Sequence, residues 1–178
     1  TRTEWRVAAT GGLYAGLAYA LLTIAAHAGR SMPGLVTFLN AVSFFSFAGF
    51  LYFYARRMAA YAGGDGFSYG RSLLFVLKMS LFGGVLAGVG QFVLVNWIEP
   101  EGFREQFDLM VANMAGGGMG EKEAEMAGSL GLKLMRNPLF AVFSGIFSML
   151  IYGGLLGLLF SIFVRRPADP FGGGTSAE

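Results

Sequence analysis

The 178-residue sequence contains no cysteine, one histidine and few charged residues. Without cysteine the chain forms no disulfide and offers no thiolate to a metal ion or to catalysis. Charged residues make up 13% of the chain, against about 25% in a typical soluble domain. The 13 Lys and Arg residues are scattered between apolar blocks and form no continuous basic stripe. This distribution argues against nucleic-acid binding.

Apolar residues are abundant, at 54% of the chain. A helix crosses the hydrocarbon layer with roughly 20 apolar residues, and four blocks are long enough: 8–28, 34–54, 72–98 and 138–164. A short turn-prone segment separates the first two blocks, and residues 99–137 separate the last two. We therefore predict an all-α, polytopic membrane domain over residues 1–166, with four transmembrane helices in two hairpins. Residues 167–178 lack apolar periodicity and are predicted to be disordered.

The basic residues predict an orientation, because Lys and Arg beside membrane spans are retained in the cytoplasm. Five lie on the side of residues 99–137. Eight lie on the other side: Arg2, Arg6, Arg56, Arg57, Arg71, Lys78, Arg165 and Arg166. Seven of the 11 acidic residues fall between Glu99 and Glu125, on the side with fewer basic residues. We predict that both termini are cytoplasmic and that the loop 99–137 faces outward.

This outer loop is predicted to contain an amphipathic helix. Apolar residues recur at helical spacing, and the acidic residues Glu101, Glu105 and Asp108 occupy the opposite face. We expect the acidic face to be solvated rather than to bind a divalent cation, and we predict no metal site. A glycine-rich hinge at 116–120 precedes a second helical stretch, 121–136. The predicted contact face toward the membrane surface or a partner comprises Phe103, Phe107, Met110 and Met114.

Three pairs of glycines have the spacing that lets membrane helices approach closely: Gly12 and Gly16, Gly84 and Gly88, and Gly153 and Gly157. We expect tight helix packing there. The alternatives are a glycine-lined cavity or a dimer face.

Lys78 lies within a predicted span, where a charged side chain is costly and is often functional. Two interpretations remain open. Its ammonium group either reaches the headgroups as an interfacial anchor or binds an anionic lipid phosphate together with Arg71, Arg56 and Arg57. The single histidine, His27, is expected to be structural. No residues form a catalytic or cofactor-binding motif, so we predict no enzyme activity and no cofactor.

Three segments resemble the family known as domain of unknown function 4199, which comprises bacterial membrane proteins found largely in Bacteroidota. These segments are Phe67–Arg71 (FSYGR), Trp97–Phe103 (WIEPEGF) and Asn137–Leu139 (NPL). Family members typically have an Asp-Pro pair where this chain has Glu99-Pro100. The resemblance implies a four-helix bundle in the bacterial inner membrane and supplies no activity. It also implies a partner, a glycosyltransferase acting on polyprenyl-phosphate.

These observations favour a non-enzymatic accessory or scaffold protein of the inner membrane, associated with polyprenyl-phosphate-linked glycan metabolism. The expected partners are membrane lipids and either a membrane protein or further copies of the chain. The alternative is a small transporter or flippase for an amphiphilic lipid-linked substrate, with Lys78 near its phosphate. An enzyme acting on lipid ranks third, because few titratable groups lie in the spans.

Overall fold

A computed structural model of the chain describes residues 2–63 and 66–167, and these residues form long helices. In chain order the helices are α1 (Arg2–Ala28), α2 (Pro33–Tyr61), α3 (Tyr69–Val93), the short π-helix η2 (Leu94–Ile98), α4 (Pro100–Gly116), α5 (Glu121–Met135) and α6 (Pro138–Val164). Helices α1, α2, α3 with η2, and α6 are each long and apolar enough to cross a membrane. The predicted all-α membrane fold with four spans is confirmed.

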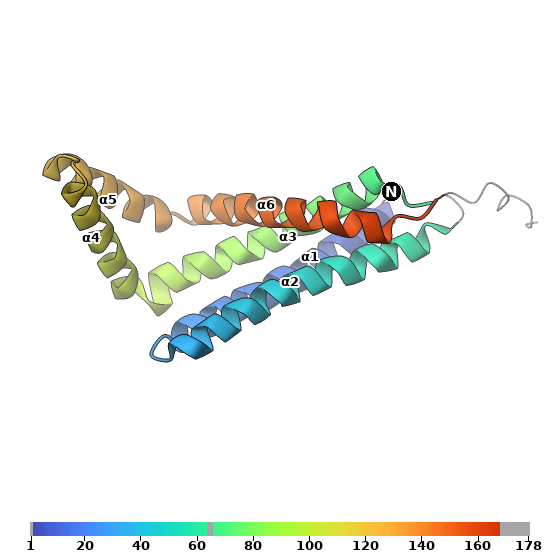
Figure 1. The fold of residues 1–178 in the computed structure, drawn as a ribbon, viewed down its shortest axis with the longest axis horizontal. Helices are drawn as coiled ribbons and strands as arrows, with labels where there is room; N and C mark the ends of the chain where they lie inside the picture. The colour runs from blue at the N-terminus through green and yellow to red at the C-terminus, as the bar shows by residue number, and fades with distance from the viewer. Residues whose placement is uncertain (1, 64–65, 168–178) are drawn as a thin grey trace, which may run out of the picture.

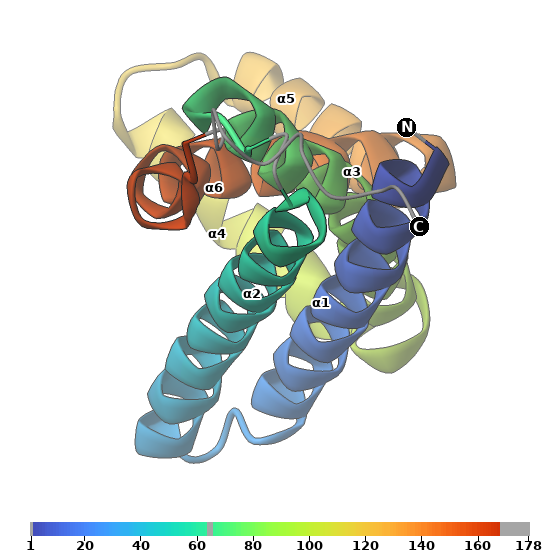
Figure 2. The same cartoon turned by 90° about the vertical axis from the view of Figure 1, so that its right-hand side faces the viewer.

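Helix α3 lies at the centre of the bundle and packs along both α1 and α6. Helices α1 and α2 form an antiparallel hairpin, which diverges from α6 toward one end of the molecule (Figure 1). We call that end, where α4 and α5 lie, the arm end. The opposite end is the basic end, where α1 and α3 begin and α2 and α6 finish; Figure 2 views the molecule from this end.

Local sequence signals set where the helices begin. Pro33 and Pro138 occupy the first turns of α2 and α6, where proline's missing N–H costs no hydrogen bond. The hydroxyl of Ser68 accepts a hydrogen bond from the Arg71 backbone N–H at the start of α3. Asn137 Oδ1 accepts one from the Leu139 N–H, at 2.9 Å. Such caps satisfy backbone donors that have no partner within the helix.

The glycine pairs hold the bundle together by direct contact between backbones. A Cβ atom added at Gly16 would lie 2.7 Å from the Gly83 Cα atom. One added at Gly88 would lie 2.6 Å from the Val142 Cα atom on α6. The predicted tight packing is confirmed. All three pairs pack against another helix of the same chain, so these faces are not available to form a dimer.

The helices extend beyond the predicted spans at the basic end. Helix α1 begins at Arg2 rather than at residue 8, and α2 continues to Tyr61 rather than ending at 54. Hydropathy identifies the segment that crosses hydrocarbon, whereas a helix continues into the polar headgroup region. The predicted disordered tail falls outside the described residues, apart from Pro167.

Helices α4 and α5 form an antiparallel hairpin, here called the arm, which projects from the arm end of the bundle (Figure 1). The predicted pair of helices with a glycine-rich hinge is confirmed. Phe107 of α4 packs over Gly131 of α5, and Val111 packs over Gly128. No residue of α4 is fully buried. The arm therefore contributes little to the core of the protein.

Candidate functional site

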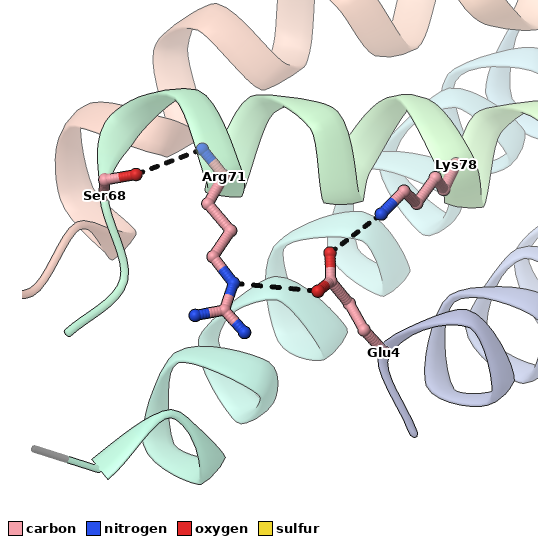
Figure 3. A network of polar contacts seen from close by, with 4 residues as sticks. All are labelled: Glu4, Ser68, Arg71 and Lys78. Carbon is pink, nitrogen blue, oxygen red and sulfur yellow. Dashed lines mark hydrogen bonds and ion pairs between the residues drawn. The ribbon is translucent and has the colours of Figure 1, made fainter. Parts of the chain in front are cut away.

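A carboxylate and two basic side chains meet at the basic end, between α1 and α3 (Figure 3). Glu4 Oε1 lies 2.9 Å from Lys78 Nζ, and Glu4 Oε2 lies 3.6 Å from Arg71 Nε. Arg71 and Lys78 are seven residues apart, so both lie on the face of α3 that packs against α1. Glu4 is only 5% exposed. We call this group the Glu4 cluster.

The Glu4 cluster gives Lys78 a protein partner for its charge within a membrane-spanning helix. The ammonium nitrogen also lies 4.9 Å from the centre of the Trp5 ring, which is a cation–π contact. Sequence reasoning placed Lys78 at a headgroup or a lipid phosphate and did not consider Glu4. The structure brings Lys78 and Arg71 together around a carboxylate, which would compete with a phosphate.

The FSYGR segment fastens three helices at the basic end. Phe67 is fully buried, and its backbone N–H and C=O pair with those of Arg166, each at 2.9 Å. Tyr69 donates its hydroxyl hydrogen to the Leu158 carbonyl of α6, at 3.2 Å. Arg71 pairs with Glu4 of α1. These motif residues therefore have structural roles that join α1, α3 and α6.

The WIEPEGF segment joins different parts of the chain at the arm end, as the FSYGR segment does at the basic end. Glu99 forms an ion pair with Arg30, from the loop between α1 and α2. His27 stacks on Phe103, with ring centres 5.6 Å apart and planes 11° apart. A side chain at Gly102 would lie 2.6 Å from Glu99 Oε1. This arm-end clasp fixes the start of α4 to the first hairpin.

The arm leaves part of its apolar surface uncovered. Among the predicted contact residues, Met110 is exposed, whereas Phe103, Phe107 and Met114 are partly buried. Phe103 contacts His27 and Phe107 contacts Gly131, so both side chains are used within the chain. A row of apolar residues on α5 is also exposed: Met126 at 68%, Leu130 at 59% and Leu134 at 40%. We call it the α5 stripe.

A small crevice lies among α1, α2 and α6 within the predicted membrane region. It has a volume of about 230 Å³. The polar side chains that line it are Tyr19, Thr23, Asn40, Ser43 and Tyr152. The polar residues Gln91 and Asn96 of α3 and η2 do not line it, and Asn96 instead donates a hydrogen bond to the Phe92 carbonyl. Asn40 lies within the predicted span 34–54, but the sequence does not show which residues of the other helices lie beside it.

The two remaining residues of the predicted phosphate site lie near the end of α2. Arg56 is exposed. Arg57 donates to the Tyr61 hydroxyl from Nε at 3.2 Å and from Nη2 at 3.1 Å, and it lines a groove between α1 and α2. The four predicted residues therefore divide into a pair held at Glu4 and a pair on α2.

Across the described residues 2–63 and 66–167, no group of three histidine, aspartate or glutamate side chains is placed to hold a metal ion. The polar groups that do come together include the Glu4 cluster, the Arg30–Glu99 ion pair, the helix caps and the hydroxyl-lined crevice. The ion pairs join different parts of the same chain.

Comparison with models of protein families finds a match over residues 10–166, to the family described as Protein of unknown function (DUF4199). The three segments that carry the resemblance lie within this range. No protein of curated function and no solved structure matches the chain.

Proposed function

The chain belongs to the DUF4199 family of unknown function, and from that premise we propose that it is a non-enzymatic accessory or scaffold protein of the bacterial inner membrane. It binds a partner through its arm. The observation that carries this proposal is the exposed α5 stripe, on a hairpin that is held to the bundle mainly at its base.

The α5 stripe is apolar on the side of α5 that α4 does not cover. Met126, Leu130 and Leu134 follow one another at four-residue spacing, so they lie along one face of the helix. Phe107 and Val111 of α4 contact a different set of α5 positions, Gly131 and Gly128. A helix that is apolar on two sides needs two partners, and α4 supplies one of them. An exposed apolar row of this kind is typical of an interaction surface.

The motif residues support a scaffold rather than a catalyst. In both segments that flank α3, a charged side chain pairs with another part of the same chain: Arg71 with Glu4, and Glu99 with Arg30. A partner in the same membrane is expected, and the family resemblance favours a glycosyltransferase that acts on polyprenyl-phosphate. The outward orientation of the arm, with both termini cytoplasmic, is part of this proposal.

The test is purification of the protein in native nanodiscs, followed by identification of the co-purifying proteins and lipids by mass spectrometry. Met126, Leu130 and Leu134 are replaced together by Gln. We expect the amount of co-purifying membrane partner, which is stoichiometric with the wild-type protein, to fall at least tenfold in this variant. The matched control replaces Glu105, Lys122 and Glu123 on the same arm by Gln and should retain the partner. Unchanged association in the stripe variant would contradict the proposal.

A second candidate is a carrier for an amphiphilic, lipid-linked substrate, and the polar crevice favours it. Five hydroxyl and amide side chains line one space among three spans, where an uncharged hydrogen-bonding group would otherwise lack partners. Transport of such a lipid in reconstituted vesicles should then fall in Asn40→Leu. It should be unchanged in Asn96→Leu, because Asn96 does not line the crevice.

A further inference from the structure

A groove of about 520 Å³ lies between α1 and α2 at the basic end. Two arginines, two threonines and two tyrosines line it: Arg6, Arg57, Thr3, Thr10, Tyr54 and Tyr61. The volume is in the range of sites that hold small molecules, roughly 300–1,000 Å³. The groove belongs neither to the Glu4 cluster nor to the arm.

Helical spacing explains how these residues come to share one groove. Thr3, Arg6 and Thr10 recur at three and four residues along α1, and Tyr54, Arg57 and Tyr61 do so along α2. Such positions lie on one face of a helix. Because α1 and α2 run antiparallel (Figure 2), Thr10 and Tyr54 lie deepest in the bundle, and the arginines lie nearer its end.

Among the residues that the structure describes, neither arginine of the groove has a carboxylate partner like the one that Arg71 and Lys78 share. Among the described residues, the ion pairs at the basic end all involve Glu4, and none includes Arg6 or Arg57. Two cations that line one groove repel each other, and an anion between them would relieve that repulsion. Arg57 is also held in place, because its guanidinium group donates two hydrogen bonds to Tyr61.

We propose that this groove binds the phosphate group of an anionic phospholipid. A planar guanidinium group is suited to phosphate oxygens, and the hydroxyl group of Thr3 supplies a further donor. The Thr10 hydroxyl donates its hydrogen to the Arg6 carbonyl, at 2.9 Å, within the same groove. The groove lies between two membrane-spanning helices at their ends, which is the depth of lipid headgroups. Tyr54, in the deeper layer, packs against Gly11 and offers its ring to the glycerol and upper acyl region.

The sequence rule for topology does not account for this arrangement. That rule asks for basic residues near the ends of spans, and Arg56 satisfies it as well as Arg57. Only Arg57 of these two lines the groove. Adjacent arginines on one helix therefore provide a matched pair, with the same charge and almost the same depth.

The test compares Arg57→Gln and Arg6→Gln with the control Arg56→Gln. Each protein is placed in nanodiscs of phosphatidylcholine mixed with phosphatidylglycerol, and the retained lipids are counted by native mass spectrometry. We expect each groove variant to reduce the preference for phosphatidylglycerol about five- to tenfold, as for loss of one cationic contact at a membrane surface. The control should keep the preference. An equal reduction in all three variants, or no preference in the wild-type protein, would overturn the proposal.

Two further measurements are needed. The first distinguishes a lipid phosphate from a free anion, and the second distinguishes loss of the Arg57 charge from a general disturbance of the fold. Glycerol phosphate and inorganic phosphate are titrated into the protein in neutral detergent; saturable binding of these anions without a lipid preference would overturn the assignment to a lipid. Tyr61→Phe keeps every charge and removes the acceptor that holds Arg57, so it should reduce the preference less than Arg57→Gln does. Because the α5 stripe lies at the opposite end, the stripe variant should keep the lipid preference, and each proposal can fail without the other.

Discussion

The bundle and the arm both rely on glycine contacts and an ion pair, but these contacts differ in kind. In the bundle, Gly16 and Gly88 bring backbone against backbone, and the ion pair involves Glu4, which is 5% exposed. In the arm, Gly128 and Gly131 receive side chains, and the clasp uses Arg30, whose side chain is 67% exposed. Backbones cannot move aside, whereas side chains can change rotamer. The bundle is therefore the rigid part, and the arm can adjust to a partner.

The largest expected effect comes from filling a backbone contact in the bundle. Gly88→Leu would push α3 away from α6, because the added Cβ meets the Val142 backbone at 2.6 Å. We expect the free energy of unfolding in detergent to fall by about 3 kcal/mol or more, as for severe overpacking. The control is Gly49→Leu on α2, where nothing lies within 4 Å of an added Cβ. Equal effects of the two substitutions would show that the backbone contact at Gly88 does not make the bundle rigid.

A smaller effect is expected at the Glu4 cluster. Glu4→Gln leaves Lys78 and Arg71 without their carboxylate, and we expect a loss of about 2 kcal/mol in the free energy of unfolding. Lys78→Met should partly rescue the variant, because it removes a cation that has lost its partner. A double-mutant cycle measures this coupling. Additive effects of the two substitutions would show that the pair contributes no interaction energy.

The smallest effect on stability is expected at the arm-end clasp. Arg30→Gln should cost at most about 1 kcal/mol, because most of the Arg30 side chain is in contact with solvent. Its main effect should be local: faster hydrogen exchange in α4, with exchange in α1 unchanged. Lys122→Gln, at the start of α5, is the control and should leave exchange in α4 unchanged. Slow exchange in α4 of the Arg30 variant would show that the clasp does not restrain the arm.

Hydropathy and helical spacing predicted the four spans and the two arm helices, because each signal lies within one continuous segment. The Glu4 cluster could not be predicted in this way. Glu4 and Lys78 are 74 residues apart, and their contact depends on which faces of α1 and α3 meet. The glycine spacing on both helices indicated close packing but did not say which helix each pair would contact.

The groove between α1 and α2 could not be predicted from the sequence either. Arg57 was identified from its charge, and Arg6 only as one of the basic residues that set the topology. Their common groove follows from the antiparallel α1–α2 hairpin and from the helical spacing of residues on both helices. In the arm, Phe107 fits an amphipathic face equally well whether that face meets α5, a membrane or a partner. Sequence periodicity cannot separate these outcomes.

The π-helix before the arm has a consequence for how the family can change. At η2 the Glu99 N–H bonds the Leu94 carbonyl five residues back, at 2.9 Å, so the turn contains one residue more than an α-helix has. The wider turn takes up this extra residue, so deleting one residue here would restore α-helical bonding while the chain beyond it keeps approximately the same direction. The end of α3 can thus lose one residue while the arm keeps its direction and every contact of the bundle before it stays in register.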